Sequence, residues 1–168
     1  MKIFVAMSMV TASLAVIGVS VGWISETQNE RERVKCLAHA RGLAQMLSSS
    51  RQVYSDCRAA EDPLPIEFAR RVMSSVEGAS ISIYSKYPFP SNKTGGLSRD
   101  GKRMRAWTAI VEDQQKEYVD SAGGIFQYAV PDVMIQSCVE CHNRHPETPK
   151  ADWKVGDVRG IIDVRIRY

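Results

Sequence analysis

The feature that most constrains this chain is a short run near its end, Cys138-Val139-Glu140-Cys141-His142. Its spacing is C-x-x-C-H, in which a histidine directly follows the second of two cysteines. Two thiols at this spacing can add across the two vinyl groups of one haem, and the histidine can offer an imidazole nitrogen to the iron. The pattern therefore predicts one covalently attached haem c at Cys138 and Cys141, with His142 as the proximal iron ligand.

A C-x-x-C pair has two other uses, as a redox dithiol and as half of a zinc site. A zinc site needs two further ligands, which Cys36, Cys57 or His39 would have to supply. A redox dithiol does not need a histidine directly after its second cysteine. The position of His142 and the apolar start of the chain favour haem over both alternatives.

The first 24 residues are expected to form an export or anchor segment. A short basic start, Met1-Lys2, precedes residues 3–23, which are 21 positions without a charged side chain. A helix of this length can cross the ~30 Å hydrocarbon core of a bilayer. Because a cleavable signal has a shorter apolar core, an uncleaved anchor is favoured and a cleaved signal peptide is the alternative. Both place the rest of the chain on the periplasmic side, either anchored to the inner membrane or secreted.

Composition and charge limit the remaining function classes. The 168 residues are 44% hydrophobic and 24% charged, which is ordinary for a globular chain. The length fits one domain at residues 25–168 after the N-terminal segment. The formal charge of +3 is small and spread along the sequence, so no nucleic-acid partner is expected. No paired acid and base can be placed near the motif, so no enzymatic activity is expected.

Apolar periodicity predicts an α+β domain. Helices are expected at residues 26–51, 65–77 and 100–118, and strands at 79–86, 124–130 and 160–168. The C-x-x-C-H run is expected in a loop between the last two strands. The last strand alternates most clearly, with Ile162, Val164 and Ile166 on one side and Asp163, Arg165 and Arg167 on the other.

The first expected helix carries an apolar face. Residues at helical spacing share this face: Cys36, Ala40, Leu43 and Leu47. The simplest interpretation is packing on the domain core. His39 lies three residues from Cys36, so either side chain could also approach an iron from the side opposite His142. Since this helix follows the membrane segment, pairing with a second copy in a homodimer is a further interpretation.

Two cysteines, Cys36 and Cys57, lie outside the motif. A disulfide between them is the simplest interpretation for an oxidising compartment. Buried free thiols are one alternative, and a thiolate that binds the haem iron is another.

Three runs of the sequence resemble one known family. They are YSKYPF at residues 84–89, CVECHNRHP at 138–146 and KADWKVGDVRG at 150–160. These runs resemble the PAS-like c-type haem domain. That family occurs alone as a secreted or anchored haem protein and as the extracytoplasmic sensor of histidine kinases and nucleotide cyclases. The resemblance covers roughly residues 30–168.

This resemblance implies a PAS-like antiparallel sheet flanked by helices, with haem at Cys138 and Cys141 and His142 as proximal ligand. His145 is expected to shape the following loop or the surroundings of a haem propionate.

The resemblance also implies that the sixth iron ligand is a cysteine from the N-terminal helical part. Cys36 is the first choice, Cys57 the second, and His39 the third. A thiolate lowers the iron potential relative to a methionine, which suits redox or gas sensing better than electron shuttling.

The sequence therefore predicts an extracytoplasmic haem-based redox or gas sensor that passes its signal to a signalling protein. The alternative is a periplasmic electron-transfer cytochrome that serves a redox partner, and a zinc-binding domain is a weaker one. The two haem functions differ at the sixth ligand, which leaves or changes in a sensor and stays in a carrier.

Overall fold

The computed structural model describes the backbone of residues 3–57, 65–90, 92, 95–97 and 101–168, with side chains described there except at 3–25, 57, 65 and 66. The chain divides into two units, Met1–Lys35 and Cys36–Tyr168. The described part of the first unit belongs to one long helix, α1 (Ile3–Cys57), and its side chains from residue 26 to 35 are exposed.

The predicted membrane segment at residues 1–24 lies in the first unit. Met1 and Lys2 fall outside the described residues, and the rest of the segment is helical backbone without described side chains. Among the described residues, no helix is both long and apolar enough to cross a membrane.

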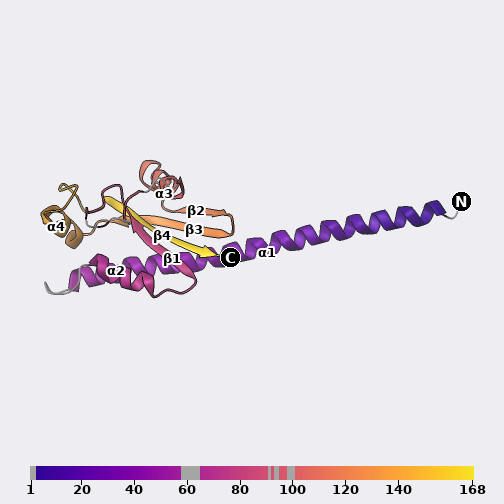
Figure 1. Ribbon diagram of the computed structural model, residues 1–168, viewed down its shortest axis with the longest axis horizontal. Coiled ribbons are helices and arrows are strands. Elements are labelled where there is room, and N and C mark those ends of the chain that lie inside the picture. Colours follow the sequence, from indigo (N-terminus) through magenta and orange to yellow (C-terminus); the bar gives the residue numbers. More distant parts are fainter. Residues whose placement is uncertain (1–2, 58–64, 91, 93–94, 98–100) are drawn as a thin grey trace. The chain divides into compact units, whose positions relative to one another are not determined.

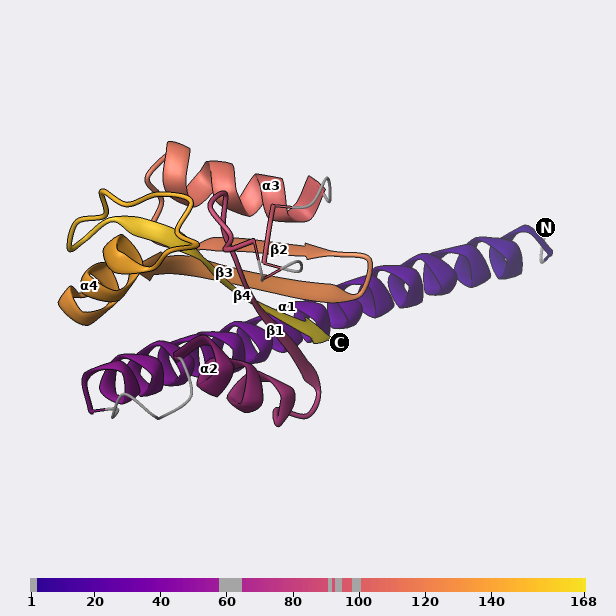
Figure 2. The same ribbon diagram turned by 60° about the vertical axis from the view of Figure 1, so that its left-hand side comes forward.

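The second unit is built on a four-stranded antiparallel sheet in the order β1-β4-β3-β2. The strands are β1 (Ala79–Tyr84), β2 (Tyr118–Ala122), β3 (Ile125–Val133) and β4 (Val158–Arg167). The helices, besides the end of α1, are α2 (Pro65–Ser74), α3 (Gly101–Trp107), its π-helical continuation η1 (Thr108–Glu112), and α4 (Gln136–Arg144). Within this unit, α1 and α2 lie on one face of the sheet and α3 on the other (Figures 1 and 2). The predicted α+β arrangement of an antiparallel sheet flanked by helices is confirmed.

The larger core lies between the sheet and the helices α1 and α2. Strand alternation directs apolar side chains to this face, and helical spacing aligns those of α1 toward them. The buried members of this core are Cys36, Ala40, Ala44, Leu47, Ala69, Phe126, Tyr128, Ile162, Val164 and Ile166. The apolar face predicted for the first helix therefore packs on the domain core.

The other face of the sheet is also covered. There α3 and η1 place Ala106, Trp107 and Ile110 against Tyr84, Ala129 and Ile161. Asp163 lies on this face and is 0% exposed, with Gln127 Nε2 donating to its Oδ1 at 2.8 Å and Arg165 Nε to its Oδ2 at 2.9 Å. The polar side of the last strand is thus partly buried.

Two elements differ from the sequence prediction. The helix expected at residues 100–118 ends at Glu112, after a π-helical turn in which Asp113 N–H donates to Thr108 C=O at 2.9 Å. The strand β2, which was not predicted, begins at Tyr118. It joins β3 through Gly123 and Gly124, whose φ values of 66° and 70° suit the tight turn of a β-hairpin.

The packing of the core predicts that substitutions at two neighbouring positions of α1 change the free energy of unfolding by very different amounts. Leu47 is 0% exposed and Met46 is 47% exposed. We expect Leu47→Ala to lower the free energy of unfolding by about 2–5 kcal/mol, because it leaves a cavity between α1 and the sheet. Met46→Ala should change it by about 0.5 kcal/mol or less. Urea unfolding followed by circular dichroism measures both, and equal losses would contradict this packing.

Candidate functional site

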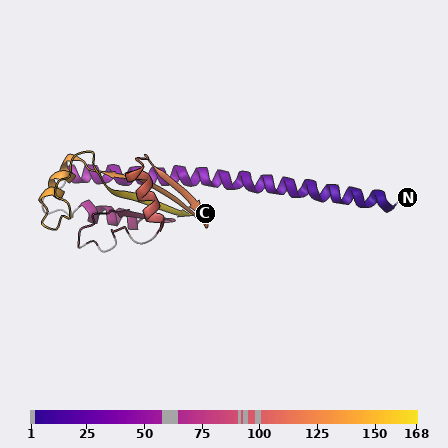
Figure 3. The same cartoon turned by 90° about the horizontal axis from the view of Figure 1, so that it is seen from above.

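The site lies at the end of the sheet where β1 and β3 finish and β4 begins. The register places Tyr84 opposite Ile161 and Asp132 opposite Gly160. Helix α4, which carries the C-x-x-C-H run, follows β3 almost directly and lies at this end (Figure 3). The run is therefore helical, and the predicted loop is wrong at this point.

A cavity of about 340 Å³ opens beside α4. Its wall comes from α1, α2, the end of β1 with the loop after it, the end of β3, α4 and the start of β4. Cys138, Cys141 and His142 all line it. The structure thus brings the two thiols and the imidazole of the motif to one cavity.

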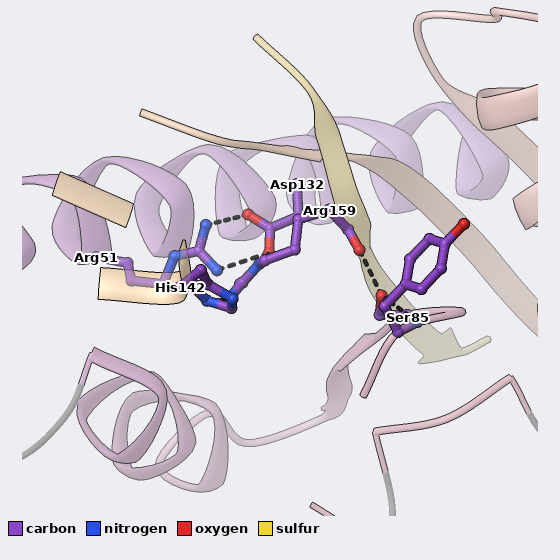
Figure 4. A network of polar contacts seen from close by, with 6 residues as sticks. Arg51, Ser85, Asp132, His142 and Arg159 are labelled. Carbon is purple, nitrogen blue, oxygen red and sulfur yellow. Dashed lines mark hydrogen bonds and ion pairs between the residues drawn. The ribbon is translucent and has the colours of Figure 1, made fainter. Parts of the chain in front are cut away.

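The centre of the polar wall is Asp132, which is 1% exposed and bound by two guanidinium groups (Figure 4). Arg51 donates Nη1 to Oδ2 at 2.8 Å and Nη2 to Oδ1. Arg159 donates Nε to Oδ2 at 3.1 Å and Nη2 to the same oxygen. Although burial alone would raise it, the Arg159 and Arg51 charges hold the pKa of Asp132 well below its usual range. One buried carboxylate therefore joins α1, β3 and β4.

The same Arg159 reaches the histidine of the motif. Its Nη1 lies 2.8 Å from His142 Nε2. Burial first, and then the Arg159 charge, lower the pKa of His142 to about 4, so the ring is neutral at pH 7. A guanidinium can only donate, so Nε2 accepts and the ring proton is assigned to Nδ1. A neutral imidazole is the form that binds a metal ion.

Ser85 fixes the backbone at this end of the sheet. Its hydroxyl donates to Arg159 C=O and accepts the N–H of Tyr87 at 2.9 Å (Figure 4). A Cβ added to Gly160 would lie 2.6 Å from Tyr84 C=O. The approach of β1 to β4 beside the cavity therefore requires glycine at position 160.

Aromatic side chains border the His142 ring. The Phe89 ring centroid is 4.9 Å from it at an interplanar angle of 34°, and that of Trp153 is 6.5 Å away at 83°. His145 also lines the cavity, 4.8 Å from Phe89, and its Nδ1 accepts the Glu147 N–H at 3.2 Å.

Two other predicted ligands, Cys36 and His39, are not brought to the cavity. Cys36 lies in the core between α1 and the sheet, and His39 is exposed. Cys36 precedes the cavity-lining Arg51 by 15 residues of one helix, a rise of about 22 Å. The side chain of Cys57 lies outside the described residues.

The disulfide interpretation is wrong, because Cys36 is not disulfide-bonded. Cys36 and Cys57 belong to one helix and lie 21 positions apart, which corresponds to a rise of about 31 Å. A disulfide requires Cα atoms less than about 7 Å apart. Within the described residues, no three His, Cys, Asp or Glu side chains are grouped as in a metal-ion site.

Three residues of the site were not predicted from the sequence: Arg51, Asp132 and Arg159. One signal was present, because Arg51 continues the helical spacing of the buried residues Ala44 and Leu47. A charged residue on an apolar stripe indicates a buried ion pair. The partner, 81 positions away, has no comparable signal.

Removing the central carboxylate tests the importance of this network. We expect Asp132→Asn to lower the free energy of unfolding at pH 7 by about 3–5 kcal/mol, because two guanidinium groups lose their buried counter-ion. Asp152→Asn is the matched control, since Asp152 is 83% exposed in its pair with Lys150, and it should cost less than about 1 kcal/mol.

The same variant has a defined pH signature. The pKa of Asp132 is lowered on folding, so its contribution is present above the ordinary carboxyl pKa of 3.8 and is lost as the pH falls through and below that value. Urea unfolding between pH 7 and pH 3 should therefore show a steeper acid loss in the parent protein than in Asp132→Asn. Parallel curves would contradict the ionised, paired carboxylate.

This chain is similar to known proteins over a region much longer than the C-x-x-C-H run. Residues 28–167 match the model of the Tll0287-like family. Among solved structures, the chain is similar to the crystal structure of the cyanobacterial heme-protein Tll0287. The TM-score is 0.59 and the sequence identity is 14%, and the match covers 79% of this chain and 95% of that one. This likeness shows a shared fold. No curated protein matches the chain.

The family match covers nearly the whole region in which the three sequence runs resemble the c-type haem domain, and it confirms that resemblance. Because the model spans most of the sequence, the protein belongs to the Tll0287-like family.

Proposed function

We propose that the protein binds one covalently attached haem c through Cys138 and Cys141, with His142 as the proximal iron ligand. The observation that carries the proposal is the meeting of two free thiols and a neutral imidazole at one cavity. The similarity to a structure described as a heme-protein supports it. When bound, the haem supplies an iron that can exchange electrons or bind a small diatomic ligand.

The residues of the cavity fit such a group. A haem has a flat apolar body and two carboxylates, and the cavity offers the ring of Phe89 together with three arginines, Arg51, Arg70 and Arg159. Asp132 is bound by two of these arginines, so a positive charge is available for a propionate. A metal ion could bind His142 Nε2 only if Arg159 released that atom. Arg159 would then keep Asp132 as its partner.

We propose that the domain works as a redox or gas sensor on the periplasmic side, with the N-terminal helix as its anchor or export segment. The polar contacts of Arg159 support sensing, because iron binding at His142 Nε2 would free its Nη1 while Asp132 still joins it to Arg51 of α1. A change in the forces on the imidazole can thereby reach the helix that leads out of the domain. The receiver would be a signalling protein, and a redox partner takes its place if the domain is an electron carrier.

For the sixth ligand we propose Cys57 in preference to Cys36 and His39. Cys57 ends α1 two residues after Ser55, which lines the cavity, whereas Cys36 belongs to the core. A thiolate ligand would give the iron a low potential.

Haem attachment is tested by producing the full chain in a periplasm that attaches haem. We expect covalent haem in the parent protein, measured by its mass and by the pyridine haemochrome spectrum. Replacing Cys138 and Cys141 by Ala should abolish attachment, and Cys36→Ala, the matched control, should retain it. A parent protein without covalent haem would overturn the proposal, and metal analysis for zinc would follow.

Spectra of the loaded protein test the sensor and the sixth ligand together. We expect Cys57→Ser to change the oxidised spectrum and Cys36→Ser to leave it unchanged, because only the former removes a ligand.

We also expect the reduced parent protein to bind carbon monoxide, since a sensor needs a labile sixth ligand. A reduced iron that ignores carbon monoxide would favour the electron carrier, and the reverse response of the two variants would favour Cys36.

A further inference from the structure

Helix α4 carries the motif, and yet none of its side chains is fully buried. It has nine residues, fewer than the roughly 12–15 that an isolated helix needs to be even marginally stable in water. The position of α4 therefore depends on contacts at its two ends. At its start, Ser137 donates to Asp56 Oδ1 at 2.8 Å and accepts from Ser55 Oγ at 3.1 Å.

At the other end, Asn143 forms a reciprocal pair of hydrogen bonds with the main chain of Trp153. Its Nδ2 donates to Trp153 C=O at 2.9 Å, and its Oδ1 accepts the Trp153 N–H at 2.9 Å. Asn143 directly follows His142, so this pair ties the residue beside the imidazole to a segment ten positions further along the chain. One side chain thus satisfies both polar groups of a main-chain residue.

The Trp153 ring is itself held in place. It is 5% exposed, meets the Tyr87 ring edge-on at 5.7 Å and 85°, and has the Lys150 ammonium 4.4 Å from its centroid. The same ring lies edge-on to His142. The indole and the Phe89 ring therefore both border the imidazole.

We propose that Asn143 is a positioning residue that sets the plane of the His142 imidazole by fixing Trp153 beside it. The proposal rests on the proposed function, because in a haem centre the orientation and polarity of the ligand's surroundings tune the metal. Asn143 and Trp153 do not line the cavity. They act through His142, and their role differs from that of the attachment residues.

The test compares loaded full-length variants. Asn143→Ala removes both main-chain bonds, and Trp153→Phe keeps them while reducing the ring. Among the described residues, the buried Trp153 Nε1 has no acceptor, so Trp153→Phe loses no known hydrogen bond. Ser137→Ala is the matched control, because it removes the polar contacts at the other end of the same helix.

We expect Asn143→Ala to shift the electron paramagnetic resonance g values and to change the equilibrium constant for reduction by up to about tenfold. Tenfold corresponds to about 59 mV for one electron. Trp153→Phe should shift the g values less than Asn143→Ala does. Ser137→Ala should leave the g values and the reduction constant unchanged, even if it lowers the stability as much as Asn143→Ala does. Loaded Asn143→Ala with parental g values and potential would overturn the proposal.

A second readout does not need haem. In the full chain with Cys138 and Cys141 replaced by Ser, nuclear Overhauser contacts between the His142 and Trp153 rings should be present. Adding Asn143→Ala should remove them, and adding Ser137→Ala should not. If the contacts respond in this way and the parent protein takes up no haem, the haem proposal fails and the positioning role stands. If haem is attached and the contacts ignore Asn143, the positioning role fails alone.

Discussion

The constraint on which this structure depends is the sharing of one buried carboxylate by two guanidinium groups. Asp132 lies at the end of β3, Arg51 in α1 and Arg159 in β4, so three elements meet at one ion cluster. Taking these charges out of water is expensive, and a hydrophobic cluster of similar volume would often be at least as stable. The gain is in geometry, because each guanidinium is held through two nitrogens and the wall of the cavity has one arrangement.

Apolar packing and polar contacts have separate tasks in the domain. The buried side chains of α1, α2 and α3 fix these helices on the two faces of the sheet. Helix α4 has no fully buried side chain and depends on hydrogen bonds at its ends. The core therefore sets the overall frame, while directional bonds place the motif against it. Directional bonds fix orientation more closely than apolar contact does, and a metal ligand needs orientation.

The features that could be predicted from the sequence are those with a local signal. The apolar stripe of the first helix and the alternation in β4 each lie within a few neighbouring residues, and such patterns predicted most of the helices and strands. Strand β2 was missed because its residues alternate weakly and its partner is required to define it. The motif was expected in a loop because α4 is short and mostly polar, so its sequence carries only a weak helical signal.

Long-range pairing was beyond local patterns. Arg51 and Asp132 are 81 positions apart, and only the fold brings them together. The distance of Cys36 from the cavity also has no local signal, since a residue on the correct face of a helix can still be several turns away. Asn143 and Trp153 belong to the runs that carry the family resemblance, but their mutual contact has no periodic signature.

Gly160 has a consequence for what the cavity can hold. The main chains of β1 and β4 come together there because position 160 has a hydrogen atom in place of a side chain. The spacing of these two strands thus fixes the position of that part of the cavity wall. A larger residue at position 160 would push one strand away from the other, so the wall would move although every other lining residue stayed the same. One hydrogen atom in place of a side chain therefore helps to define the shape of the cavity.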